Sequence, residues 1–154
     1  MPEAPNLAVL LAPVLTRVPP EAQPRFLALL ERGAAERYRE WAKQAPAQAA
    51  GLFTCAAREE EIAERVEELF PAGDETITAL AQLLPQAREI YYGTFAGLSL
   101  REQWRVQASA ERQGAAAWRT FTALVADANI RHALEACAKL EEENATYLEG
   151  VSSS

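Results

Sequence analysis

The amino-acid sequence predicts an all-α protein built on a bundle of four long helices. Long segments rich in Ala, Leu, Glu, Arg and Gln favour helix, and no run of alternating β-branched residues indicates a strand. Only 7 of the 154 residues are glycine. An acidic segment that begins at Cys55 is also repeated 82 residues later, from Cys137. These features predict two related helical hairpins in a single domain.

The first three helices are bounded by prolines. Pro20 suits the first turn of a helix, while Pro46 and Pro71 cannot continue one and therefore mark the ends of the next two. The ranges expected for these helices are about 7–17, 20–44 and 48–69.

A segment with its own helix is expected to join the two hairpins. Asp74 can cap this helix, Pro85 divides or kinks it, and it ends near Gly93 to Gly97. A connection of this kind can cross the length of a bundle. The expected division of the single domain, 1–154, is therefore a first hairpin over 18–70, a crossover over 71–98 and a second hairpin over 99–150.

The last two helices have polar start signals. Ser99 and Glu102 have the spacing of a capping box, in which each side chain binds a free backbone N–H of the first turn. Asp127 or Asn129 can start the final helix, which we expect to end near Glu149, before a frayed serine tail.

The repeat extends to the first helix of each hairpin. Residues 31–39 read ERGAAERYR and residues 111–119 read ERQGAAAWR, which places Tyr38 opposite Trp118. This offset of 80 residues is close to the 82 of the acidic segments. The first helices of the two hairpins therefore correspond to each other, as the second helices do.

Each of the four helices has one glutamate on or beside its apolar stripe. Glu59 lies four residues after Cys55 and three before Ile62, which is helical spacing. The equivalent positions in the other helices are Glu31, Glu111 and Glu141.

A carboxylate on an apolar stripe is costly unless it is paired, protonated or bound to metal. Four such groups in one layer are expected to raise one another's pKa, and divalent cations would offset this repulsion. We therefore predict Glu31, Glu59, Glu111 and Glu141 as metal ligands. The alternative is that they lie at the stripe edges and pair with Arg32, Arg58 or Arg112.

Composition limits the partners and the compartment. The net charge of −7 disfavours nucleic acids and anionic membranes. The apolar run over residues 7–15 is too short to span a membrane, and no CxxC pair occurs for a thiolate zinc site. We expect a cytoplasmic protein in which Cys55 and Cys137 are reduced core residues.

These motifs resemble the ferritin-like superfamily, and within it the rubrerythrin-type bundle. Glu31 is followed seven residues later by Tyr38, and Glu111 by Trp118, as in that family. Residues 56–63 and 138–145 resemble the helices that carry Glu-x-x-His. The resemblance covers about residues 20–150 and implies a carboxylate-bridged di-iron centre, oxygen or peroxide chemistry and self-association as a dimer.

Both histidine positions depart from this pattern. Ile62 cannot ligate a metal, and Asn144 offers only a neutral oxygen, which is weak for iron. The single histidine, His132, is nine residues before Glu141 and half a turn out of phase, so we expect it at the surface.

Two functions follow from these observations. The first is a ferritin-like protein whose degenerate carboxylate site binds a divalent metal, in a metal-related or oxidative-stress role. The alternative is a metal-free, non-catalytic bundle that serves as a structural or protein-interaction module. The cofactor alternatives are iron, manganese or no metal, and Tyr38 is either a core aromatic or a hydrogen-bonding group at the site.

Overall fold

The computed structural model describes residues 3–153. Over this range the chain has six α-helices, two single-turn 3₁₀ helices at 20–22 and 46–48, and no strand, which confirms the all-α prediction. The α-helices are α1 (Leu7–Leu15), α2 (Gln23–Gln44), α3 (Ala49–Leu69), α4 (Asp74–Gly93), α5 (Leu100–Leu124) and α6 (Ala128–Ser153).

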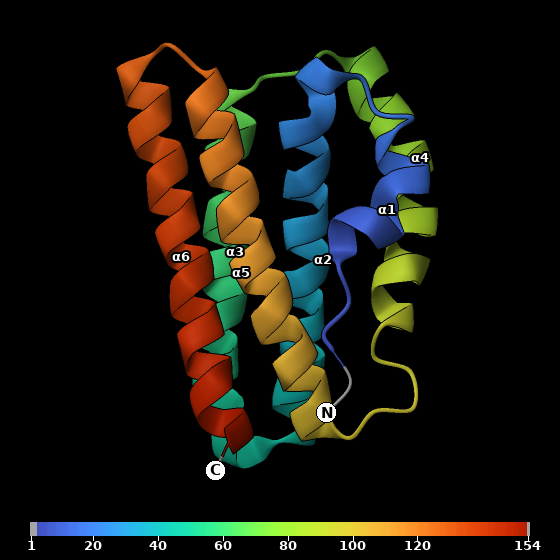
Figure 1. Ribbon diagram of the computed structural model, residues 1–154, viewed down its shortest axis with the longest axis vertical. Helices are drawn as coiled ribbons and strands as arrows, with labels where there is room; N and C mark the ends of the chain where they lie inside the picture. The colour runs from blue at the N-terminus through green and yellow to red at the C-terminus, as the bar shows by residue number, and fades with distance from the viewer. Residues whose placement is uncertain (1–2, 154) are drawn as a thin grey trace.

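Four long helices lie side by side along the long axis of the molecule (Figure 1). α2 packs on α3 and α5 packs on α6, and contacts between α3 and α6 join the two pairs. The pairs correspond to the two hairpins expected from the repeat. α1 and α4 pack on each other beside α2, outside this group of four.

The connection between the hairpins runs the length of the molecule. α4 returns the chain to the end at which α3 began, so that α3 and α5 run in the same direction (Figure 1). Pro85 lies inside α4 and does not divide it. The cap prediction at Asp74 is wrong, because Gly73 precedes the helix and Asp74 is in its first turn, where a carboxylate favours the positive end of the helix dipole.

The start signals of the last two helices are confirmed. Glu102 N–H donates to Ser99 Oγ at 3.3 Å, and Ser99 N–H donates to Glu102 Oε2 at 2.7 Å. Asp127 Oδ1 accepts from two backbone N–H groups at the start of α6. The prediction of a frayed tail is wrong for Ser152 and Ser153, because α6 continues to Ser153 and Ser152 is buried, with its carbonyl accepting a bond from Arg105 Nη2. Ser154 lies outside the described residues.

Two apolar clusters fill the space between the four long helices. One cluster centres on Trp41, Leu52 and Trp104, and the other on Ile62 and Trp118. A third cluster joins α1 and α4 to the outer face of α2. No helix within residues 3–153 has both the length and the apolar character needed to cross a membrane.

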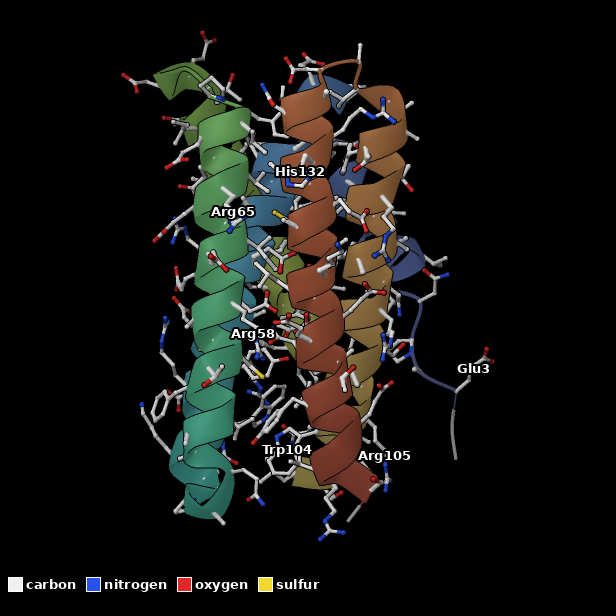
Figure 2. All side chains as sticks on the ribbon, turned by 90° about the vertical axis from the view of Figure 1, so that its left-hand side faces the viewer. Glu3, Arg58, Arg65, Trp104, Arg105 and His132 are labelled. Carbon is white, nitrogen blue, oxygen red and sulfur yellow. The ribbon has the colours of Figure 1, made fainter. Side chains whose placement is uncertain are left out.

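Three individual predictions are also confirmed. Cys55 and Cys137 are buried and unpaired. His132 is exposed on the outer side of α6 (Figure 2), well away from the layer in which the four glutamates lie.

Candidate metal centre

The four predicted glutamates form a polar layer between the two apolar clusters. Along α3, Cys55 and Ala56 belong to one cluster and Ile62 to the other, and Glu59 lies between them. The same order is found along α2, α5 and α6. The helical period therefore places one carboxylate per helix at this level, as the sequence predicted.

Three of the four carboxylates meet. Oxygens of Glu31, Glu59 and Glu141 all lie within 4.8 Å of one another. Glu59 and Glu141 are 0% and 2% exposed, and Glu31 is half-buried. Glu111 is only 1% exposed but lies outside this group of three. We refer to Glu31, Glu59 and Glu141 as the carboxylate triad.

Neutral donors hold one oxygen of Glu59 and of Glu141. Asn144 Nδ2 donates to Glu59 Oε1 at 2.7 Å, and Trp118 Nε1 donates to Glu141 Oε1 at 3.0 Å. These bonds fix the orientation of both carboxylates, and in Glu59 the second oxygen, Oε2, has no hydrogen-bond partner among the described residues.

Glu111 is bound by a separate set of donors. Tyr38 Oη donates to Glu111 Oε1 at 2.6 Å, and Gln107 Nε2 donates to the same oxygen at 2.9 Å. Tyr91 Oη in turn donates to Gln107 Oε1. Tyr38 is thus both a fully buried core aromatic and a hydrogen-bonding group at the site.

Two buried oxygens at this level have no hydrogen-bond partner within residues 3–153. They are Glu59 Oε2 and Glu111 Oε2. A buried oxygen without a partner costs about 1–3 kcal/mol, and more when it is charged. The layer therefore has two acceptors that are suited to a proton or a cation.

The three arginines of the alternative prediction bind other groups. Arg32 pairs with Glu60 and Glu67, and Arg112 pairs with Glu149. These contacts lie outside the polar layer.

Arg58 lies between α3 and α6 (Figure 2). Its Nε pairs with Glu143 Oε2 at 3.1 Å, and its Nη1 donates to Asn144 Oδ1 at 3.2 Å. It therefore contacts the layer only through Asn144.

The two substituted histidine positions provide no metal ligand. Ile62 packs in an apolar cluster. The amide nitrogen of Asn144 donates to Glu59, and its oxygen accepts from Arg58. These residues do not fit the histidine-containing iron pair of the family that the sequence resembles, whereas an oxygen-only set fits a hard cation such as Mn²⁺ or Mg²⁺.

Burial and mutual repulsion raise the pKa of the triad. Burial raises the pKa of Glu31 to about 7, and the charge of Glu111 acts in the same direction. The pKa values of Glu59 and Glu141 are raised well above the usual range, first by burial and then by the neighbouring carboxylates. Near neutral pH, and without a cation, Glu31 is therefore about half protonated, and the charged forms of Glu59 and Glu141 are disfavoured.

Sequence reasoning missed the donors that orient these carboxylates. Gln107 and Glu111 are separated by four residues, a spacing that puts both on one helix face, so Gln107 could have been found. The role of Trp118 could not have been found from the repeat. Its equivalent, Tyr38, donates to Glu111 of the other hairpin, whereas Trp118 donates to Glu141 of the same hairpin.

Comparisons of the chain with protein-family models, with curated proteins and with solved structures found no match.

Gly114 of α5 packs directly against the triad. A Cβ atom at this position would lie 2.6 Å from Glu141 Oε1 and 2.8 Å from its Cδ. At Gly33 of α2 the nearest atom would be Arg88 Nε, at an ordinary 3.7 Å. The two glycines are thus a matched pair for testing the geometry of the site.

We expect Gly114→Ala to lower the free energy of unfolding by about 1–2 kcal/mol, because the carboxylate of Glu141 must leave its place. Gly33→Ala should raise it by about 0.5–1 kcal/mol through helix propensity alone. Urea unfolding of both variants measures the difference, and equal stabilities would show that Glu141 does not lie against α5.

Proposed function

We propose that this chain is a ferritin-like four-helix-bundle protein whose carboxylate centre binds a divalent metal cation. The observation that carries the proposal is the carboxylate triad itself. Three glutamates from three helices place oxygens within 4.8 Å of one another in a buried layer, and Glu59 Oε2 has no partner there.

The order of the helices supports the bundle class. The ferritin-like fold is a four-helix bundle with one long crossover and with glutamates that project inward from its helices. Here α4 provides a connection along the length of the molecule (Figure 1), and each of the four long helices contributes one glutamate to the layer. The role of such a centre is metal handling or protection against oxidants.

The donor set favours a hard cation. Carboxylate oxygens suit Mn²⁺, Mg²⁺ and Ca²⁺, whereas imidazole nitrogen suits iron and zinc. Binding of a cation would neutralise repulsion among the triad carboxylates and give Glu59 Oε2 a partner. The protein would therefore be more stable with the metal than without it.

The test is metal content after expression in medium supplemented with iron and manganese. We expect close to stoichiometric metal in the native protein and a loss of most of it in the double variant Glu59→Gln/Glu141→Gln. The matched control is Glu60→Gln/Glu142→Gln, which removes the next glutamate of each acidic segment, where the side chains pair with arginines instead. This control should retain the metal.

Metal below about 0.1 equivalent in the native protein, unchanged in the Glu59/Glu141 variant, would contradict the proposal. That result would favour the alternative, a metal-free interaction module. The observation on that side is the apolar surface of α1, where Val9 and Leu10 are 68% and 40% exposed.

A further inference from the structure

The four glutamates are not equivalent in the structure, although the repeat places them at equivalent positions. Glu31, Glu59 and Glu141 meet, whereas Glu111 is outside the triad and is bound to Tyr38 and Gln107. A centre for two cations with this ligand set would need all four carboxylates, and it would need several of them to bridge the ions through both oxygens.

Hydrogen bonding reduces the capacity of three of these carboxylates to bridge two ions. Asn144, Trp118 and Tyr38 each donate to the Oε1 atom of a different carboxylate, at 2.7, 3.0 and 2.6 Å. An oxygen that accepts a short bond from a buried donor has less capacity to bind a cation. Glu59, Glu141 and Glu111 therefore each have one oxygen that accepts none of these bonds and is the better ligand atom.

Arg58 further disfavours a second cation on the α3–α6 side. Its guanidinium lies 3.2 Å from Asn144 Oδ1, and Asn144 Nδ2 lies 2.7 Å from Glu59 Oε1. This fixed positive charge is next to the position at which the related centres carry a metal-binding histidine. A divalent ion placed there would face like charge.

We propose that the centre binds one oxygen-coordinated divalent cation per chain, held by Glu31, Glu59 and Glu141, with Glu111 outside the coordination set. This inference rests on the proposed function and specifies its stoichiometry and ligands. Glu111 Oε2 is buried without a partner and is close enough to Glu141 to raise the pKa of that carboxyl. It is suited to accept a hydrogen bond from a water molecule on the cation, which makes Glu111 a positioning residue.

The test is a titration of the chelator-treated full chain with Mn²⁺, followed by electron paramagnetic resonance and native mass spectrometry. We expect one ion per chain, with the hyperfine pattern of an isolated Mn²⁺. Two ions with a magnetically coupled spectrum would overturn the inference and leave the proposed function standing. No bound ion at all would overturn the proposed function as well.

Two isosteric variants identify the ligands. Glu141→Gln should abolish uptake over the same concentration range, because it removes one of three ligands. Glu111→Gln should still take up one ion at saturation, with about tenfold weaker affinity, as expected for an outer-sphere partner. Loss of the ion in Glu111→Gln to the same extent as in Glu141→Gln would contradict the assignment of Glu111.

Thermal unfolding of both variants without metal serves as the control for folding. Each substitution removes a buried carboxyl group and keeps its shape, so neither should lower Tm. A variant that unfolds early is replaced by the corresponding methionine substitution, which keeps most of the side-chain volume and offers no carboxylate, so that the expected ion counts are the same.

Discussion

In the presence of a chelator, the protein is expected to be less stable at about pH 8 than at about pH 5.5, by about 2–3 kcal/mol or more. Burial raises the pKa of Glu31 from 4.5 to about 7 in the folded protein. At a pH between the unfolded-state pKa of 4.5 and the folded-state pKa of about 7, the folded protein binds more protons than the unfolded chain. The free energy of unfolding therefore falls as the pH rises through this range.

Glu31 alone supplies part of this difference. About 1.5 pH units separate pH 5.5 from its folded-state pKa of about 7. At about 1.4 kcal/mol per unit they correspond to about 2 kcal/mol, which the half-buried position of Glu31 reduces to about 1–2 kcal/mol. Glu59 and Glu141 shift in the same direction and add to the effect. For a chain of this size we expect Tm to be lower by about 5–10 °C at the higher pH.

Surface ion pairs do not interfere in this pH range. Arg119 lowers the pKa values of Glu135 and Glu142, so these pairs lose stability only as the pH falls below the usual range of a glutamate. The triple variant Glu31→Gln/Glu59→Gln/Glu141→Gln should show an almost flat profile between about pH 5.5 and 8. A native profile that is flat or rises with pH would contradict the burial of these carboxyl groups.

Addition of Mn²⁺ should restore the free energy of unfolding that the protein loses at the higher pH. A ligand at a hundred times its Kd stabilises the folded state by about 2.7 kcal/mol. Mn²⁺ should therefore raise Tm at about pH 8 by about 5–10 °C and have much less effect at about pH 5.5, where protons compete for the same oxygens.

The second large effect is expected at Trp41, where Trp41→Ala should lower the free energy of unfolding by about 3–5 kcal/mol. The side chain is 0% exposed, and its ring contacts those of Tyr38 and Phe95 edge-on, with centroids 5.4 Å apart in both pairs. Its Nε1 also donates to Gln103 Oε1 at 2.9 Å. Removal of the ring leaves a cavity beneath Tyr38, the residue that orients Glu111.

Trp104 of the same cluster is the matched control. It is 4% exposed, and its Nε1 has no hydrogen-bond partner among the described residues. Trp41→Phe loses both volume and a hydrogen bond, whereas Trp104→Phe loses volume alone. Urea unfolding should therefore show Trp41→Phe to be the less stable of the two by about 1 kcal/mol. Equal losses would argue against the bond to Gln103.

Much of the fold could be predicted from local patterns, because helical period and helix ends depend on neighbours in the sequence. The capping box at Ser99 needed only residues three apart, and its bonds are confirmed. Tertiary packing overrode such signals in α6, where burial of Ser152 and the bond from Arg105 extend the helix beyond Glu149.

Some features of the candidate site likewise depend on the sequence alone, and others depend on the tertiary structure. The sequence by itself determined that each long helix has one glutamate on or beside its apolar stripe at an equivalent position. It also determined that Ile62 and Asn144 lie three residues after Glu59 and Glu141, where the pattern that the sequence resembles has histidine. These facts depend only on residue type and spacing. The tertiary structure decided that Glu111 is not one of the three carboxylates that meet within 4.8 Å, that Trp118 bonds to Glu141 and that Arg58 binds Asn144. Contacts of this kind depend on how neighbouring helices are rotated and offset, and two segments that are alike in sequence need not share them.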